Sequence, residues 1–140
     1  MTEGQTGKSK LLLVDDDPLF RRYLTTLFPR KEYEAVVASS GEEAIKQARR
    51  LQPDLIVLDL DMPSLDGIET CKILKADEAT KQIPVVILTA TESVELNQKS
   101  FEAGAQATVL KSVNRERFSN LVDVIIQSKR AAGSSAVSEG

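Results

Sequence analysis

Charged residues stand directly after largely apolar runs at three places in this sequence. The acidic pair Asp15-Asp16 follows the run 11–14, Asp59 follows the run 55–58, and Lys111 follows the run 107–110. If these runs are neighbouring parallel strands, their carboxyl ends meet at one edge of a sheet and bring the charges together. Clustered carboxylates repel one another, so they persist mainly where a cation offsets their charge. The grouping therefore indicates magnesium and phosphoryl-transfer chemistry.

The three acidic residues suit both parts of that chemistry. Magnesium prefers oxygen ligands and usually takes only one or two carboxylates, while water and phosphate oxygens complete its coordination. Asp16 and Asp59 can supply the carboxylates, and Asp15 can hold a ligand water. An aspartate can also act as the nucleophile of phosphoryl transfer and form an acyl phosphate.

The remaining polar groups suit the charge that develops on a transferred phosphoryl group. A lysine, a hydroxyl and a backbone N–H that point at its oxygens would stabilise them. Lys111, the Thr89 hydroxyl and the Ala90 amide are the candidates, and Thr89-Ala90 closes the apolar run 83–88. The sequence has no histidine, which excludes a histidine-based triad, a histidine zinc site and a phosphohistidine on this chain. A phosphoryl group carried by this chain would therefore be carried by a carboxylate.

Composition sets the broad class of the protein. Its 140 residues fit one domain, and an apolar content of 41% is enough for a core without disulfides. Cys71 is the only cysteine, so a reducing cytosol is the default location and a buried, inert thiol is its simplest role. The net charge of −3 gives no nucleic-acid footprint. No apolar run is long enough for a membrane span, and residues 1–10 lack the apolar core of a signal peptide.

Apolar periodicity and capping residues predict five strands alternating with five helices. Asp17-Pro18 reads as an N-cap followed by proline at the first helical position, and Ser40 with Glu43 reads as a capping box. Gly104 reads as a helix C-cap. We predict a disordered lead-in at 1–9, one folded unit at 10–129, and a flexible tail or severed linker at 130–140. The predicted strands are 10–14, 33–38, 55–58, 83–88 and 106–110, and the predicted helices are 18–28, 41–52, 68–77, 92–103 and 114–128.

This alternation predicts an α/β fold with a doubly wound parallel sheet that is covered by helices on both faces. In the flavodoxin-like strand order 2-1-3-4-5, ligands bind between strands one and three, where the winding direction reverses. Those strands end in Asp15-Asp16 and in Asp59. The last predicted helix carries a core stripe of Phe118, Leu121, Val122 and Ile125, whereas Val124 and Ile126 lie off it, as partner contacts or as local packing.

With these residues in place, the chain resembles the receiver domain of two-component response regulators, the CheY-like family. The resemblance covers roughly residues 10–128 and rests on six elements that occur in order on the predicted strands and loops. These are Asp15-Asp16, Asp59, Met62-Pro63 with Asp66-Gly67, Thr89-Ala90, Ala103-Gly104-Ala105 and Lys111.

The resemblance implies a phosphoacceptor and a metal site. Asp59 would accept a phosphoryl group from a histidine kinase or a histidine phosphotransfer protein. Asp15, Asp16 and Asp59 would hold Mg²⁺, together with the backbone carbonyl of Asp61. The side chain of Asp61 would face solvent near the metal, where it would either tune metal affinity and phosphate lifetime or serve only as a solvated surface charge.

The resemblance also implies how the signal leaves the site. Thr89, Lys111 and the Ala90 amide would contact the phosphoryl oxygens, and movement of Thr89 would alter the surface of the fourth helix, fifth strand and fifth helix. A downstream protein, a covalently linked output domain or a second copy of the chain would bind there. The family implies a cytoplasmic signalling switch rather than an enzyme, with no direct contact to nucleic acid or membrane.

Two positions depart from the family pattern. Ser112 follows Lys111 where the family usually has proline after a cis peptide bond. A cis bond costs about 2.5–4 kcal/mol before serine and about 0.5–1 kcal/mol before proline, so this turn is trans, or cis under strain. Thr108 stands where the family often has an aromatic residue whose rotamer couples to the threonine. The site chemistry needs neither feature, but signal transmission often uses the ring.

Simpler readings of the same residues remain. Asp17 is best explained as a helix cap. Thr89 can be explained without a function, as a β-branched residue at a strand end. Taken alone, Lys111 or Asp59 would be an ordinary strand-end residue. Asp59-Leu60-Asp61 also resembles the Asp-x-Asp signature of haloacid-dehalogenase-type phosphatases, although those enzymes place it at the first strand. A receiver domain cut from a larger regulator is a further alternative.

Overall fold

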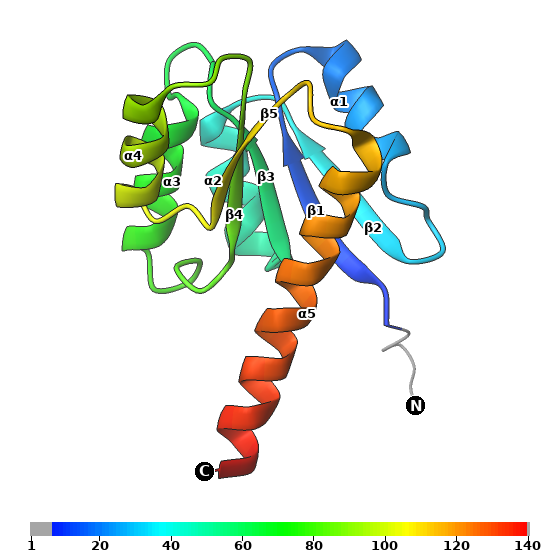
Figure 1. Ribbon diagram of the computed structural model, residues 1–140. Helices are drawn as coiled ribbons and strands as arrows, with labels where there is room; N and C mark the ends of the chain where they lie inside the picture. The colour runs from blue at the N-terminus through cyan, green and yellow to red at the C-terminus, as the bar shows by residue number, and fades with distance from the viewer. Residues whose placement is uncertain (1–6, 140) are drawn as a thin grey trace.

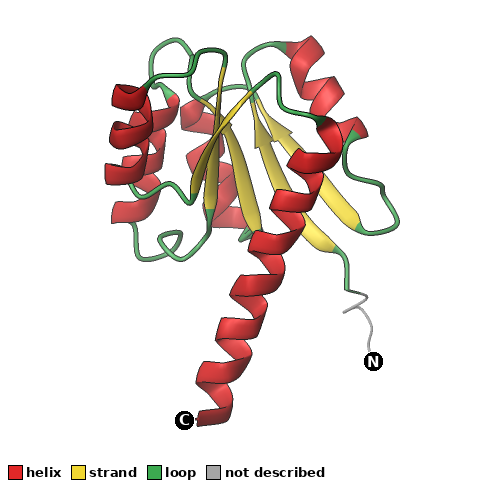
Figure 2. Ribbon diagram, in the orientation of Figure 1, coloured by secondary structure: helices red, strands yellow, loops and turns green. Residues whose placement is uncertain are grey.

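The computed structural model describes residues 7–139, and the side chains of residues 7–132. Five strands alternate with five helices, as Figures 1 and 2 show. The part of the predicted lead-in that precedes residue 7 lies outside the described residues. The elements are β1 (Ser9–Val14), α1 (Pro18–Thr26), β2 (Tyr33–Ala38), α2 (Gly41–Leu51), β3 (Leu55–Asp59), α3 (Gly67–Ala76), β4 (Val85–Thr89), α4 (Val94–Glu102), β5 (Ala107–Leu110) and α5 (Arg115–Glu139).

The five strands form one parallel sheet in the order β2-β1-β3-β4-β5, which confirms the predicted fold. The register pairs Val14 with Leu58, and Asp59 with Leu88. It also pairs Thr89 with Leu110. The carboxyl ends of four strands therefore meet at one edge, because each strand stops within a residue of its neighbour.

Helices cover both faces of the sheet and bury two separate apolar layers (Figure 2). Alternate strand residues point to opposite faces, so Leu12 and Val14 enter one layer while Leu11 and Leu13 enter the other. The first layer packs against α2, α3 and α4, and the second packs against α1 and α5. Cys71 is fully buried in the first layer, where burial raises the pKa of its thiol to about 11.

Polar caps fix where the helices begin. Asp17 caps α1 as predicted, since its side chain accepts a hydrogen bond from Leu19 N. Only half of the predicted box at α2 is present: Glu43 N donates to Ser40, but the Glu43 carboxylate accepts from Ser39 rather than from Ser40. The complete capping box of this protein lies at α3, between the side chains and backbone amides of Asp66 and Glu69.

The core-facing stripe of α5 differs from the prediction. Phe118, Val122 and Ile126 are almost fully buried, whereas Val124 is 58% exposed. Their spacing of four residues turns the buried stripe gradually around the helix, so Ile126 is a core residue and Val124 a surface residue. Of the four predicted core residues, Phe118 and Val122 are confirmed as buried, whereas Leu121 and Ile125 are half-buried.

The other main difference is the end of α5. The helix was expected to stop at about residue 128, but it continues to Glu139. Its last turns extend beyond the body of the domain, at the end of the sheet where β1 begins (Figure 1). Alanine is the strongest helix former and extending a formed helix is cheap, so an Ala-Ser-Gly composition is compatible with a continued helix. The interpretation of 130–140 as a tail or linker stays a prediction.

Besides its buried side chains, α5 contacts the folded body through Arg130, near the point where the helix leaves it. Arg130 lies 3.6 Å from Asp54 and donates a hydrogen bond to the Ser9 hydroxyl at 3.3 Å.

Within residues 7–139, no helix has both the length and the hydrophobicity that crossing a membrane requires.

Candidate functional site

Three charged side chains from three different strand ends meet at the carboxyl edge of the sheet. The Lys111 ammonium lies 3.0 Å from the Asp15 carboxylate and 3.1 Å from the Asp59 carboxylate. The side chains of Asp15 and Asp59 are 1% and 2% exposed, and that of Lys111 is 23% exposed. The sheet alone brings these residues together, because 96 residues separate Asp15 from Lys111 along the chain.

The segment after β1 holds the Asp15 side chain in place. Asp17 N donates to Asp15 Oδ1 at 2.8 Å, which leaves Oδ2 for Lys111. The Arg21 guanidinium, one turn into α1, donates to the Asp15 backbone carbonyl at 2.8 Å. The cap of α1 and the acidic residue of the site are therefore built by one short segment.

Burial sets the electrostatics of Asp59. Desolvation of the carboxylate raises its pKa from 3.8 to about 6, and the negative charge of Asp15 adds to this, although Lys111 acts in the opposite direction. Burial lowers the pKa of the Lys111 ammonium, but its hydrogen bonds and ion pairs with Asp15 and Asp59 outweigh burial, so the net pKa is raised. The ammonium is therefore firmly protonated at neutral pH.

The donor set fits a hard cation. Asp15, Asp16 and Asp59 each offer a carboxylate oxygen, and these oxygens lie within 4.8 Å of one another. Asp15 and Asp59 are buried while Asp16 is exposed, so the cluster opens to solvent on one side. An all-oxygen set of carboxylates with a solvated side is what Mg²⁺ prefers, since it keeps several of its waters.

Thr89 and Ala90 lie at the same edge of the sheet as the three charged side chains. Thr89 is 3% exposed, and its hydroxyl donates to the Thr91 carbonyl and accepts from Thr91 N, both at 3.2 Å. The described contacts do not join it to Asp59 or Lys111. Ala90 follows as an exposed residue.

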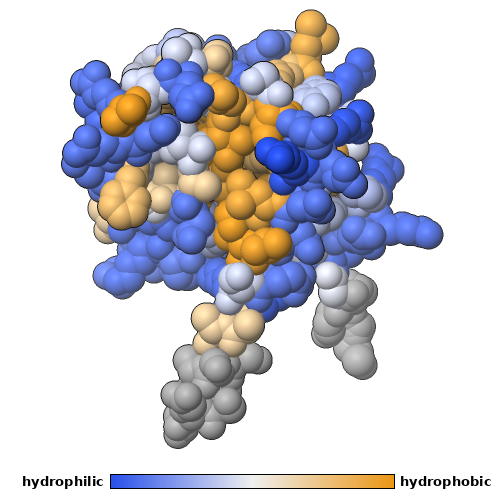
Figure 3. Space-filling model, viewed as in Figure 1, coloured by the Kyte–Doolittle hydropathy of each residue, from blue (hydrophilic) through white to orange (hydrophobic). Residues whose placement is uncertain are grey.

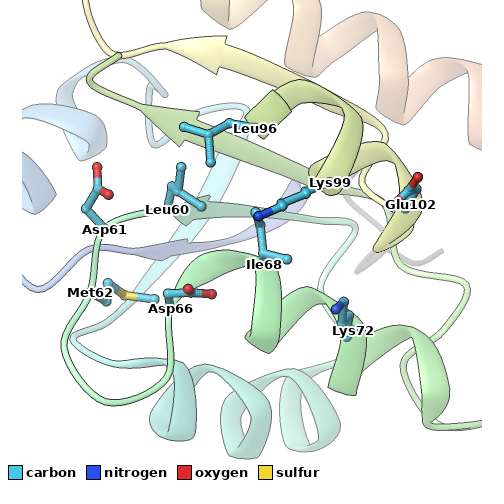
Figure 4. Close-up of a pocket in the computed structure, with 9 residues that line it drawn as sticks. All are labelled: Leu60, Asp61, Met62, Asp66, Ile68, Lys72, Leu96, Lys99 and Glu102. Atoms are coloured by element: carbon cyan, nitrogen blue, oxygen red, sulfur yellow. The ribbon is translucent and has the colours of Figure 1, made fainter. Parts of the chain in front are cut away.

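Asp61 lies beside the acceptor, with an exposed side chain. Its backbone N–H donates to Asp59 Oδ1 at 3.3 Å. Figure 4 shows Asp61 at one end of a groove of about 720 Å³ that continues between α3 and α4 past Leu96 and Lys99 to Glu102. The groove is adjacent to the acidic cluster and does not include Asp59 or Lys111.

The two departures from the family pattern have clear structural outcomes. The Lys111-Ser112 peptide bond is trans. Thr89 and Thr108 both line a hollow of about 300 Å³ between β5 and the β4–α4 segment.

Sequence reasoning missed two side chains at this site. Arg21 gave no signal, because its partner is a backbone carbonyl. Phe20 was not singled out from the sequence, yet its ring centroid lies 4.5 Å from the Lys111 ammonium. An aromatic residue one helical turn after an acidic pair was the available signal.

We predict that Gly67→Ala disturbs both stability and the site. The new Cβ would lie 2.5 Å from the Asp59 carbonyl oxygen and 2.8 Å from Leu60 Cα, and neither backbone atom can rotate away. Urea unfolding should show a loss of about 1–3 kcal/mol. The exposed Lys72→Ala on the same helix should stay within about 0.5 kcal/mol of wild type. Equal stability of the two variants would refute the contact.

Comparisons with known proteins agree with this geometry. The family model described as "Response regulator receiver domain" matches residues 11–123. The transcriptional regulatory protein ResD of Bacillus subtilis is 38% identical over 107 residues, which are 76% of this chain and 43% of ResD. The DNA-binding response regulator MtrA of Mycolicibacterium smegmatis is 36% identical over 107 residues, 76% of this chain and 45% of MtrA.

A solved structure gives the same fold. The chemotaxis protein CheY4 of Vibrio cholerae superposes with a TM-score of 0.79 at 28% identity, covering 84% of this chain and 98% of the CheY4 chain. The match thus takes in nearly the whole CheY4 chain but less than half the length of ResD and MtrA.

Proposed function

This chain belongs to the response regulator receiver domain family, and on that premise we propose that it is a phosphorylation-controlled switch of a two-component system. Asp59 accepts a phosphoryl group from a histidine kinase or a histidine phosphotransfer protein. The observation that carries the proposal is the buried Asp59 carboxylate, held 3.1 Å from the Lys111 ammonium at the end of β3.

The transfer uses an ionised Asp59. One of its oxygens attacks the phosphorus, the bond from phosphorus to the donor imidazole breaks, and the imidazole leaves with the electron pair. A pKa of about 6 keeps the carboxylate ionised at neutral pH. Lys111 is close enough to offset the charge of the incoming oxygens. Asp15, Asp16, Asp59 and the Asp61 carbonyl would hold Mg²⁺, which would add positive charge beside the transferred group.

The phosphoryl group then redirects Thr89. Its hydroxyl leaves Thr91 for a phosphoryl oxygen, and the Ala90 N–H binds a second one. This movement shifts the β4–α4 segment and with it the surface of α4, β5 and α5. Because Thr108 has no aromatic ring, no change of an aromatic rotamer can transmit the signal. The conformational change is transmitted by the β4–α4 segment, which lies beside the hollow.

An apolar strip on that surface supports a role in docking. In Figure 3 the strip runs down the face between α4 and α5. Val124 is 58% exposed there, and Val109 and Ile125 are half-buried. A downstream protein, an output domain or a second copy of this chain in a homodimer docks on this strip. In this proposal the histidine kinase or histidine phosphotransfer protein is the source of the phosphoryl group. The proposed location of this protein is the cytoplasm.

The receiver unit comprises residues 10–129 in this proposal. ResD and MtrA are named as transcriptional or DNA-binding regulators, and this chain matches less than half of each. If this chain is part of a longer regulator, α5 leads to the output domain, and any nucleic-acid binding belongs to that domain. The proposed receiver unit itself does not bind nucleic acid or membrane.

A stoichiometry experiment tests the proposed function. The chain is incubated with acetyl phosphate, with Mg²⁺ or with a chelator, and followed by intact-mass spectrometry and by phosphate release. We expect at most one phosphate per chain, formed much faster with Mg²⁺ and lost slowly after the donor is removed. Release of many phosphates per chain would instead favour a phosphatase with an aspartate nucleophile, and the absence of both an adduct and phosphate release would refute both functions.

A further inference from the structure

The Lys111 ammonium has a third partner besides the two carboxylates. Its Nζ atom lies 4.5 Å from the centroid of the Phe20 ring. A cation over the face of an aromatic ring is attracted by the negative potential of that face, and the attraction grows as water is excluded. Lys111 is 23% exposed, so much of its surroundings is already dry.

The Phe20 ring is well anchored. It lies in the first turn of α1, whose start is fixed by the Asp17 cap and by Pro18. The ring is half-buried against the apolar layer beneath α1, and its centroid lies 5.5 Å from that of Tyr23. The segment that carries Asp15 and Asp16 thus also carries the ring that faces Lys111.

A second ring and a second cation repeat the arrangement. Tyr23 lies on α1 with the Arg115 guanidinium 6.0 Å from its ring centroid. Both rings belong to α1, while Lys111 directly follows β5 and Arg115 is the first residue of α5. Phe20 and Tyr23 therefore connect the acidic end of β1 to the position of Lys111.

A lysine ammonium needs such restraint. Its long side chain has several rotatable bonds, and fixing it costs considerable rotamer entropy. The backbone holds Lys111 through its N–H bond to the Thr89 carbonyl at 2.8 Å, but this bond does not direct the side chain. Two carboxylates and one ring surround the ammonium, and the ring is the one of these three partners that carries no charge and lies outside the transfer itself.

We propose that Phe20 is a positioning residue for phosphoryl transfer, because its ring holds the Lys111 ammonium beside Asp59 where the phosphoryl oxygens arrive. This inference rests on the proposed function. With acetyl phosphate as donor, the bond from phosphorus to the acetate oxygen breaks, acetate leaves with the electron pair, and the Asp59 oxygen forms the new bond to phosphorus. Phe20 touches none of these atoms and acts only through Lys111.

The first test compares rates of phosphorylation by acetyl phosphate with Mg²⁺. Phe20→Leu keeps an apolar side chain but removes the ring face, and we expect its rate to fall about fivefold. Phe20→Tyr should stay within about twofold of wild type, because the ring is retained. Leu19→Ala changes the neighbouring residue, which is 74% exposed, and should leave the rate unchanged.

Fluorinated phenylalanines at position 20 separate positioning from packing. Mono-, di- and trifluorination progressively weaken the negative potential of the ring face while the ring keeps its shape. We expect a stepwise fall in rate across this series with a nearly constant melting temperature. Equal rates across the series would overturn the inference even if Phe20→Leu proved too unstable to measure.

A double-mutant cycle and an NMR measurement complete the test. In a Lys111→Ala background, Phe20→Leu should cause no further loss of rate, because the two changes act on one interaction. The ε-methylene protons of Lys111 should carry a ring-current shift that disappears in Phe20→Leu. A wild-type chain that acquires no phosphate would refute the proposed function, whereas a phosphorylated wild type with an equally fast Phe20→Leu variant would refute only the role of Phe20.

Discussion

Asp59→Asn should reduce phosphorylation by acetyl phosphate from one phosphate per chain to none. The substitution removes the nucleophilic oxygen but keeps the size of the side chain, and an amide cannot form the acyl phosphate. The carboxylates of Asp15 and Asp16 remain nearby in this variant. The experiment therefore also tests whether a neighbouring carboxylate can accept the phosphoryl group in place of Asp59. Intact-mass spectrometry after incubation with donor and Mg²⁺ gives the answer directly.

Asp61→Asn is the matched control for this experiment. It changes the charge by the same amount two residues away, its side chain is exposed, and its backbone carbonyl is kept. We expect it to acquire one phosphate per chain, and its rate of phosphate loss measures whether the Asp61 carboxylate tunes phosphate lifetime. A phosphorylated Asp59→Asn chain would show that Asp59 is not the sole acceptor.

Without metal, Asp59→Asn should also stabilise the protein by about 2 kcal/mol at pH 7.5. Burial raises the pKa of Asp59 to about 6, so the folded state binds this proton more tightly than the unfolded chain. The contribution of Asp59 to the wild-type free energy of unfolding therefore falls as pH rises from about 4 to about 6. A shift of about two pKa units corresponds to ~3 kcal/mol, and the asparagine amide loses part of that gain because it must also be desolvated.

Urea unfolding in the presence of a chelator measures this effect at a series of pH values. The stabilisation of the variant relative to wild type should fall by about 3 kcal/mol as the pH drops from 7.5 to below about 3, where Asp59 is neutral in both the folded and the unfolded state. Subtracting the wild-type free energy of unfolding from that of the variant removes the contributions of the titrating groups that the two proteins share. Mg²⁺ should stabilise wild type more than the variant, since binding to the folded state adds stability. A difference that is independent of pH would show that burial of the Asp59 charge is not its cause.

Local sequence signals account for most of the fold. The apolar runs and the caps predicted five strands and five helices, and the doubly wound order followed from their alternation. The errors fell where tertiary packing decides between similar patterns. Val124 and Ile126 lie on nearly opposite sides of one helix, and the packing of α5 on the sheet decides which of them is buried.

The amino-acid sequence determined which chemical groups this protein presents. Asp15, Asp16, Asp59 and Lys111 each follow a strand, and a parallel sheet gathers strand ends, so their approach could be foreseen. Tertiary structure alone decided how those groups are held. The position of Phe20 over Lys111, the hydrogen bond from Arg21 to the Asp15 carbonyl and the engagement of Thr89 with Thr91 depend on distances between elements or on backbone directions. Such distances cannot be read from the identity of single residues, because they result from the packing of the whole chain.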